Sequence, residues 1–492
     1  MVAWSTLLAG ALSAVAPIPT PASPAGRAGD DDGADGAPFA LAPMQHAMWV
    51  GRGEDVPLGG VAGHLYVEFD SAPGESGVDP ERLRAAAAAL AARHPMLRVA
   101  FTADGTQRIR ADAQVGVTVC DLRGLDAATV QQRLAHTREA KSHQQLHDAV
   151  FELTVSLLPE DRTRLHVDLD MQAADAASYR TVMADLAAAY RGEAVPELRY
   201  TYRRYRAAMA SRKVDDRHRQ WWAERIPELP DPPKLPAPAG VIRDPRRSTR
   251  RWHRLDASTR DALCGHARAH GLTPAMALAG SFCHTLAGWS AEPRFLLNVP
   301  LFGREPLDDD VDRLVGDFTS SLLLDIDLSA SATGAQRAHT VQQAMRTAAA
   351  HADYPGVAVL RDLTRHRGTP ALAPVVFTSA LGLGNLFAGD VISAFGTPVW
   401  IMSQGPQVLL DAQVTELDDG VLVNWDVREE MFAPGVIDAM FAHHIADLTR
   451  LAGGQGWTDP VPRTLPVEQA AARAGQRRHR RVQRRHPARR FL

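Results

Sequence analysis

The sequence predicts a mixed α/β fold made of two lobes of similar size. The chain has 492 residues, enough for two or three domain-sized units with a large core. Segments with the two-residue period of strands alternate with segments that have helical spacing. A stretch of very high proline content lies near the middle and excludes both helix and central strand. We therefore expect a first lobe at residues 38–225, a connector at 226–240 and a second lobe at 241–455.

The composition is ordinary for a globular protein. Apolar residues make up 45% of the chain, charged residues 23%, and the formal net charge is -3. This charge indicates no general affinity for nucleic acid or membranes, and no apolar run reaches the roughly 18 to 20 residues of a membrane helix. The three cysteines lie far apart without C-x-x-C spacing, which predicts neither a zinc site nor a disulfide framework. A cytoplasmic location fits best.

Both ends of the chain differ in composition from the lobes. Residues 1–37 begin with an apolar stretch that lacks the basic start of a signal peptide, so we interpret it as the last helix of a preceding domain. The rest of this segment, rich in Pro, Ala, Gly and Asp, is typical of a flexible linker. Residues 456–492 are expected to be a second linker and a basic tail with eight Arg and no acid in its last 17 residues.

The first informative stretch is D-M-Q-A-A-D-A-A-S at residues 170–178, where a strand runs into a helix. Residues 164–171 alternate between apolar and polar side chains, which predicts a half-buried strand with its polar residues on one face. Residues 176–190 have helical spacing. The polar face would carry His166, Asp168 and Asp170. Their spacing is explained by the strand alone, so we predict no metal site there.

Two carboxylates of this stretch have different expected duties. Asp175 precedes the helix and is placed as its N-cap, where its carboxylate accepts from the unpaired amides of the first turn. Asp170 has no such local duty, and the sequence leaves open whether it lines a cleft or forms a structural ion pair. Ser178 completes the pattern D-x-x-x-x-D-x-x-S.

The second lobe is predicted to contain helices at 258–270, 273–289 and 434–452 and strands at 295–302, 375–377 and 421–425. The strand at 375–377 leads directly to Thr378, which is followed by a glycine-rich loop. On sequence alone Thr378 is also an ordinary β-former.

The second informative stretch is Q-G-P-Q-V-L-L-D-A-Q-V-T-E at residues 404–416. If it is extended, Leu409, Asp411 and Gln413 share one face and Val408, Leu410, Ala412 and Val414 the other. Burial among Val and Leu would raise the pKa of Asp411, and such a carboxyl group can act as acid and base in turn. The alternative is a structural Asp bonded to Gln or Arg.

Together these motifs resemble the heterocyclisation domains of nonribosomal peptide synthetases, a branch of the condensation-domain superfamily. The pattern at Asp170, Asp175 and Ser178 stands where ordinary condensation domains have H-H-x-x-x-D-G, whose second His is tied to amide formation. Further matches are F-A-L-A-P-M-Q-H-A-M-W-V-G-R from residue 39, R-H-P-M-L-R from residue 93 and V-G-D-F-T from residue 315. The resemblance covers about residues 38–470.

The resemblance implies two lobes similar to chloramphenicol acetyltransferase, open as a V around a central tunnel. The implied reaction joins a salicyl thioester to carrier-bound Ser or Thr and closes the product to an oxazoline, in siderophore biosynthesis of the mycobactin type. Asp411 and Thr378 match the family's cyclodehydration residues. Asp170 would aid condensation, while Asp175, Ser178 and Gln413 would shape the tunnel and hold the lobes.

The implied partners are an aryl carrier domain and a peptidyl carrier domain, each presenting its substrate on 4'-phosphopantetheine, and an adenylation domain that would follow the linker at 456–492. The chain itself is expected to bind no cofactor. Residues 1–37 would then be the remnant of a carrier domain and its linker. Two alternatives remain open: a plain condensation domain, and a catalytically inactive fragment that docks carrier domains.

Overall fold

The computed structural model describes residues 36–460 except 73, 75, 76, 147, 148, 214, 239–241 and 243. The segments expected to be a preceding domain remnant and a basic tail therefore lie almost entirely outside the described residues. Packing divides the chain into two compact units. The first contains residues up to 214, 301–320 and 382–406, and the second contains 215–300, 321–381 and the residues from 407 onward.

Each unit is thus assembled from separate stretches of chain. The mixed α/β class and the presence of two units agree with the sequence prediction. The observed units differ from the contiguous lobes expected at 38–225 and 241–455. Residues 301–320 and 382–406, expected in the second lobe, pack within the first unit. The V shape and the tunnel implied by the resemblance stay predictions.

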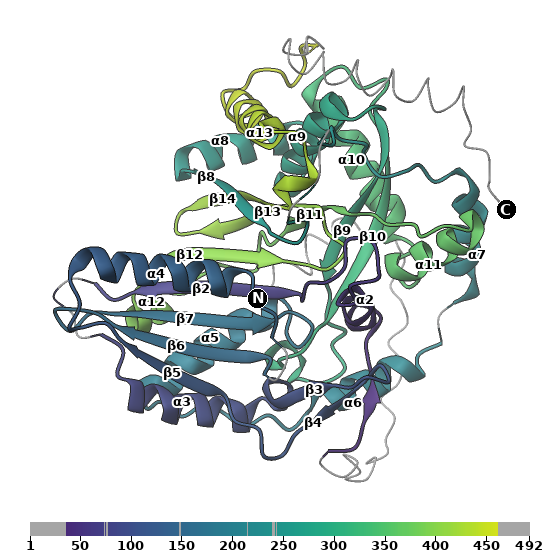
Figure 1. Cartoon of the computed structure of the whole chain (residues 1–492). Helices are drawn as coiled ribbons and strands as arrows, with labels where there is room; N and C mark the ends of the chain where they lie inside the picture. Colours follow the sequence, from purple (N-terminus) through teal and green to yellow (C-terminus); the bar gives the residue numbers. More distant parts are fainter. Residues whose placement is uncertain are drawn as a thin grey trace. The chain divides into compact units, whose positions relative to one another are not determined.

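The first unit is built around a five-stranded sheet of order β12-β2-β7-β6-β5 (Figure 1). All neighbouring strands are antiparallel except β5 and β6. Helix α4 covers one face of the sheet, and α3, α5 and α12 cover the other (Figure 1). A small sheet of order β1-β4-β3 lies beside it. The elements are β1 Phe39–Ala40, α2 Pro43–Gly51, β2 His64–Asp70, α3 Pro80–Arg93, η1 Pro95–Arg98, β3 Val99–Phe101, β4 Thr106–Ile109, β5 Gly116–Asp121, α4 Ala127–Ser142, β6 Phe151–Leu157, β7 Thr163–Asp170, α5 Ala176–Arg191, α6 Tyr202–Ser211, η3 Val311–Arg313, α12 Gly389–Phe395 and β12 Thr397–Gln404.

The second unit is built around a six-stranded sheet of order β10-β9-β11-β13-β14-β8 (Figure 1). Helices α8, α9 and α13 pack on one face of it. Strands β9 and β10 lie mostly in this unit and each extends by two residues into the segment 301–320. The elements are α7 Asp216–Arg225, η2 Ile226–Glu228, β8 Thr249–Leu255, α8 Ala257–Ala269, α9 Pro274–Trp289, β9 Arg294–Phe302, β10 Thr319–Asp327, α10 Gly334–Ala349, α11 Gly356–Arg367, β11 Val375–Ser379, β13 Leu410–Leu417, β14 Gly420–Val427, η4 Glu429–Met431 and α13 Val436–Ala452.

Most predicted elements are confirmed, and three expectations need correction. The predicted strand at 164–171 is β7, but it is not half-buried, because α4 covers its polar face and seven of its eight residues are buried. The stretch 404–416 is not one extended segment, since β12 ends at Gln404 and β13 begins at Leu410. The connector holds one short 3-10 turn at Ile226–Glu228, and its described residues after that form neither helix nor strand.

Glycine is required where the segment 301–320 packs against α6. A Cβ atom on Gly316 would lie 2.2 Å from Cδ2 of Tyr202, a distance that no side chain tolerates. The glycine therefore allows the G-D-F-T turn to lie directly against an aromatic ring. None of the helices in the described part of the chain is both long and apolar enough to cross a membrane.

Candidate active site

The sheet of the second unit has one apolar and one polar face at strand β13. Phe377, Leu410 and Trp425 are fully buried on the apolar face. Phe282 of α9 packs against Phe377 and Trp425, with ring centroids 5.9 and 5.4 Å apart. The two-residue period of β13 then places Asp411 and Gln413 on the opposite face, as the sequence predicted.

The polar face brings three of the predicted site residues together. Strand β11 runs parallel to β13 with Thr378 opposite Gln413. The Thr378 hydroxyl donates to Asp411 Oδ1 at 2.8 Å, and Gln413 Nε2 donates to Asp411 Oδ2 at 2.7 Å. Both carboxylate oxygens of Asp411 therefore accept a hydrogen bond from a partly exposed side chain.

A second layer of polar residues continues across β14 and β8. Asp426 lies opposite Asp411, and Arg250 lies opposite Asp426. Arg250 donates to both carboxylate oxygens of Asp426, at 2.6 and 2.5 Å, and both side chains are 4% exposed. Asn424 donates to Gln413 Oε1 at 3.0 Å. The polar face is thus a continuous hydrogen-bonded row over four strands.

These surroundings place the titration of Asp411 close to neutral pH. Burial is the main cause and, with the nearby Asp426 carboxylate, raises the pKa of Asp411 to about 6. The hydrogen bonds from Gln413 and Thr378 and the charge of Arg250 act in the opposite direction. Asp411 has features of both alternatives that the sequence left open. Like a structural Asp, it is hydrogen-bonded to a Gln. Like an acid-base residue, it is partly exposed and has a pKa suited to proton transfer.

Asp170 lies in the first unit and takes part in a buried ion pair. Its carboxylate is 1% exposed and accepts from Arg52 of the chain after α2 and from the backbone N–H of Gln172 at 2.9 Å. Burial raises the pKa of Asp170, and Arg52 opposes that shift. Of the two alternatives left open by the sequence, the geometry has the features of the structural ion pair. The part proposed for Asp170 in condensation stays a prediction.

Asp175 and Ser178 fasten the G-D-F-T turn to helix α5. Asp175 is the N-cap of α5, as predicted, and accepts from Ser178 N at 2.7 Å and from Phe318 N at 3.3 Å. The Ser178 hydroxyl contacts both the carbonyl and the N–H of Gly316, at 2.8 and 3.1 Å. Arg304 donates to the Ser178 hydroxyl at 2.9 Å and lies 4.0 Å from the ring centre of Phe318. These two motif residues therefore hold a turn 138 residues away.

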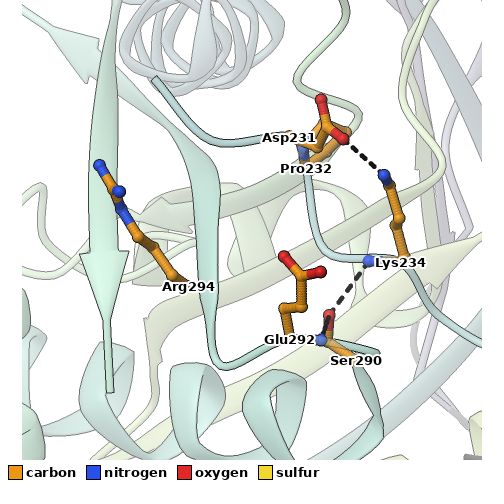
Figure 2. Close-up of a pocket in the computed structure, with 6 residues that line it drawn as sticks. All are labelled: Asp231, Pro232, Lys234, Ser290, Glu292 and Arg294. Carbon is orange, nitrogen blue, oxygen red and sulfur yellow. Dashed lines mark hydrogen bonds and ion pairs between the residues drawn. The ribbon is translucent and has the colours of Figure 1, made fainter. Parts of the chain in front are cut away.

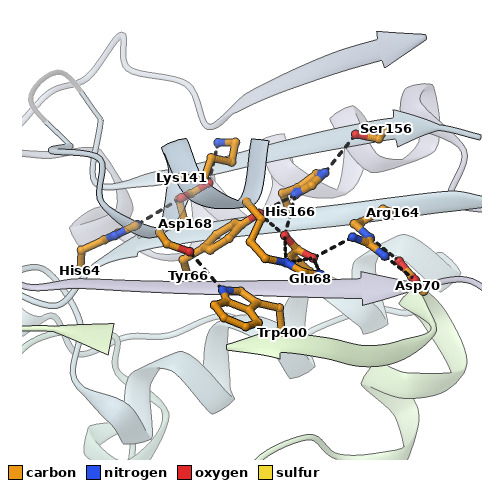
Figure 3. A network of polar contacts seen from close by, with 12 residues as sticks. His64, Tyr66, Glu68, Asp70, Lys141, Ser156, Arg164, His166, Asp168 and Trp400 are labelled. Carbon is orange, nitrogen blue, oxygen red and sulfur yellow. Dashed lines mark hydrogen bonds and ion pairs between the residues drawn. The ribbon is translucent and has the colours of Figure 1, made fainter. Parts of the chain in front are cut away.

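The polar face of β7 is filled by a network of charged side chains beneath α4 (Figure 3). Asp168 contacts His64 at 3.1 Å and Lys141 of α4 at 2.7 Å. His166 lies between the Tyr66 hydroxyl, at 2.7 Å, and Ser156, at 3.0 Å (Figure 3). Within the described residues no group of three metal-ligating side chains is assembled. The alternation in this strand instead forms a buried polar layer of the first unit.

A small polar pocket in the second unit offers a weaker site (Figure 2). Three of its charged residues already have close partners: Lys234 bonds Asp231 at 2.5 Å, and Arg294 forms an ion pair with Asp325 at 2.7 Å. Asp231 also accepts from Arg367 at 3.0 Å. The lining residues are Asp231, Pro232, Lys234, Ser290, Glu292 and Arg294. A pocket whose charges neutralise one another has little left with which to bind a substrate.

Sequence reasoning missed Arg250, Asp426 and Arg52. Asp426 alternates with Asn424 along the strand predicted at 421–425, so the two-residue period could have placed it on the face of Asp411 if the strand had been extended by one residue. Arg250 and Arg52 gave no comparable local indication, because their partners lie 176 and 118 residues away.

Residues 40–449 match the condensation domain family. The chain belongs to the condensation domain family. It is 62% identical over 481 residues to the phenyloxazoline synthase MbtB of Mycobacterium tuberculosis, covering 96% of this chain and 33% of that protein. It is 37% identical to the pyochelin synthetase PchE of Pseudomonas aeruginosa over 96% of this chain and 32% of that one.

Among solved structures the chain is similar to the cyclization-docking bidomain of the synthetase EpoB from Sorangium cellulosum. The TM-score is 0.75 at 32% identity, over 86% of each chain. This match confirms the resemblance to heterocyclisation domains that the motifs indicated. The chain spans about a third of the length of the curated relatives it matches.

Proposed function

We propose that this chain is a heterocyclisation domain that condenses a carrier-bound aryl thioester with carrier-bound Ser or Thr and cyclodehydrates the product to an oxazoline. The observation that carries the proposal is Asp411, a partly exposed carboxyl group with a pKa of about 6 held between Thr378 and Gln413. Its setting is a chain that is 62% identical to a phenyloxazoline synthase. A salicyl donor and a role in siderophore assembly are part of the proposal.

Condensation precedes ring closure. The amine of the carrier-bound Ser or Thr attacks the carbonyl carbon of the aryl thioester, the C–S bond breaks, and the donor carrier leaves as its free thiol. The thioesters are substrates presented on the phosphopantetheine arms of an aryl carrier and a peptidyl carrier, and an adenylation domain would load the amino acid. Asp170 is the residue that we assign to assist this step.

Asp411 would transfer the protons of ring closure. The Ser or Thr hydroxyl attacks the new amide carbonyl while Asp411, ionised above its pKa, takes the hydroxyl proton. Protonated Asp411 then returns this proton to the former carbonyl oxygen. The amide nitrogen loses its proton as the C=N bond forms, and the oxygen departs with both protons as water. A pKa near neutrality lets one carboxyl group serve as base and acid in succession.

Thr378 would stabilise the tetrahedral intermediate. In the resting structure its hydroxyl proton is directed at Asp411 Oδ1. When Asp411 becomes protonated, it can donate to the Thr378 oxygen instead, which frees the Thr378 proton for the oxygen of the intermediate. The donor thus becomes available at the stage when negative charge develops on that oxygen. Asp175, Ser178 and Gln413 would keep the surrounding structure in place.

The test is intact-mass analysis of the acceptor carrier after this chain is mixed with salicyl-loaded and seryl-loaded carriers. We expect a salicyl-seryl adduct lighter than the amide by one water. The uncyclised amide as the sole product would instead favour a plain condensation domain. Carrier binding without any adduct would favour an inactive docking fragment, and either result would overturn the proposal.

A further inference from the structure

The side-chain amide of Gln413 links the candidate catalytic carboxyl group to a buried ion pair. Gln413 Nε2 lies 2.7 Å from Asp411 Oδ2 and 3.2 Å from Asp426 Oδ2, so one NH₂ group serves both carboxylates. Gln413 Oε1 accepts from Asn424 at 3.0 Å and from Arg250 at 3.5 Å. The amide orientation therefore follows from its hydrogen-bond partners: its NH₂ group faces two acceptors and its oxygen faces two donors.

We propose that Arg250 and Asp426 are positioning residues that hold the Gln413 amide against Asp411 and set the electrostatic field in which Asp411 exchanges protons. The proposal rests on the proposed function and deepens it. Neither residue touches the reacting atoms in this assignment. Their influence reaches Asp411 through Gln413 and through space, from strands β14 and β8.

The geometry of the pair suits this duty. A guanidinium that donates to both oxygens of a carboxylate has little freedom to rotate. At 4% exposure each, neither charge is screened by water to the extent of a surface pair. Asp426 is also opposite Asp411 in the antiparallel register, where facing side chains lie close together. A fixed negative charge beside Asp411 and a fixed positive charge behind it result.

Two further elements pack on β13, namely strand β11 and helix α9. Strand β11 contributes the uncharged Thr378. Helix α9 packs on the apolar face through Phe282, and its His284 contacts His443 of α13 instead. Among the described residues of this sheet, Asp426 and Arg250 are the charged groups with a marked influence on Asp411, Asp426 raising and Arg250 lowering its proton affinity.

Removing the two charges one at a time should shift the acidic limb of the pH profile in opposite directions. A pair with a purely structural role would not give this result. Asp426→Asn removes the negative charge, and Arg250 then favours ionised Asp411. Arg250→Met leaves Asp426 without its counter-charge and favours protonated Asp411. We expect the acidic limb of the pH profile for oxazoline formation to move down by about one pH unit in Asp426→Asn and up by about one unit in Arg250→Met.

A double variant separates the electrostatic effect on Asp411 from the effect on the orientation of the Gln413 amide. In Arg250→Met/Asp426→Leu both charges are absent, so the acidic limb should lie near its wild-type position. Gln413 has lost two of its partners, however, and the rate at optimal pH should fall on the order of tenfold. Where a single variant fails to fold, Arg250→Lys and Asp426→Glu replace it. They keep the charges but lose the paired hydrogen bonds between the guanidinium and both carboxylate oxygens. We expect these variants to have a reduced rate and an acidic limb at the wild-type position.

The matched control is Arg251→Met. Arg251 is the next residue of β8, points to the opposite face and pairs with Glu429 and Asp438. Its removal should leave the acidic limb in place. The experiment measures amide and oxazoline on the acceptor carrier by intact mass across pH, with thermal unfolding of each variant recorded in parallel.

The inference is overturned if the acidic limb of the pH profile stays at its wild-type position in both Asp426→Asn and Arg250→Met, or if it moves in the same direction in both. The proposed function would still stand. A wild-type chain that makes no oxazoline overturns the proposed function and the inference with it. Opposite displacements in the two single variants, with Arg251→Met unmoved, support the inference.

Discussion

Asp411 is a carboxyl group that exchanges a proton near neutral pH because it is largely, though not fully, removed from water and lies beside a second carboxylate. Replacing it by Asn preserves size and most hydrogen bonding but removes proton exchange. We expect Asp411→Asn to lower oxazoline formation by at least about 100-fold while the uncyclised amide accumulates. The product ratio is read by intact mass of the acceptor carrier.

The matched control for that experiment is Asp419→Asn. Asp419 is an exposed carboxylate in the turn between β13 and β14 and pairs with Arg254. Its loss should leave the ratio of oxazoline to amide unchanged. Full heterocycle formation by Asp411→Asn would show that another group transfers the protons.

Asp317 gives a separate prediction for the pH dependence of stability. Burial, with Asp175 nearby, raises the pKa of Asp317 from 3.8 to about 7. The folded state therefore binds this proton more tightly than the unfolded state. The resulting stabilisation is complete below about pH 4 and is lost as the pH rises through 7. At pH 8 the folded chain holds a buried, ionised carboxylate that is 2% exposed.

Asp317→Asn removes that ionisation and can still accept from Thr319 N. We expect the variant to be more stable than the wild type at pH 8, by roughly 3 kcal/mol, and the difference to shrink towards zero at pH 4. Urea unfolding at both pH values measures it. A difference that does not depend on pH would show that Asp317 is ionised in the folded chain throughout.

At the scale of elements, the Ser178 hydroxyl joins helix α5 to the G-D-F-T turn at residues 316–319, beside the contacts that Asp175 makes with the same turn. Ser178 contacts Arg304 and both backbone groups of Gly316, all in buried surroundings. Ser178→Ala leaves the buried Gly316 N–H without its acceptor, whereas the Gly316 carbonyl still accepts from Asp175 N and Arg304 still pairs with Asp175. The substitution should lower the free energy of unfolding by about 2 kcal/mol.

The comparison for this substitution is Thr333→Ala, which removes the N-cap of α10 at a site where the capping contacts are exposed. It should cost about 1 kcal/mol. Denaturant unfolding of both variants provides the values. Equal losses would mean that Ser178 acts as an ordinary member of a first helical turn and not as a link to the turn at Gly316.

The elements illustrate what local sequence predicts. The two-residue period placed Asp411 and Gln413 on one face of β13 because a strand allows no other alternation. The helical spacing of α5 and its Asp175 cap followed from equally local rules. The break between β12 and β13 was missed because the stretch 404–416 was treated as one extended segment, although Gly405 and Pro406, residues typical of a turn, lie within it.

Pairing between distant segments was beyond such reasoning. Arg250 reaches Asp426 through the register of β8 on β14, which tertiary folding sets. The burial of the polar face of β7 depends on Lys141 and Arg138 of α4, which neutralise Asp168 of β7 and Glu68 of the neighbouring strand β2. Alternating polar and apolar residues predict a strand with one exposed face, because the sequence shows which side chains are polar but not whether they are buried. A polar face that oppositely charged residues cover therefore gives the same sequence pattern.

At the scale of the whole molecule, the first unit depends on segments that lie late in the sequence. Strand β12 pairs with β2 from Thr397 opposite Asp70 to Gln404 opposite His64. Gly316, which Asp175 and Ser178 hold, comes from the segment 301–320. A cut at the proline-rich connector would therefore separate the first unit from two of its parts.

We predict that a fragment of residues 36–225, which contains the first lobe predicted from the sequence at 38–225, does not fold independently. Without β12, the outer edge of β2 exposes unpaired N–H and C=O groups along seven residues. Phe69 loses its contact with Phe387, and α5 loses the turn that its N-terminus holds. We expect the fragment to aggregate in size-exclusion chromatography and to lack a cooperative thermal transition, whereas residues 36–460 remain monodisperse under the same conditions. A monomeric fragment that melts cooperatively would show that the first 225 residues contain a self-sufficient core and that β12 is an accessory strand.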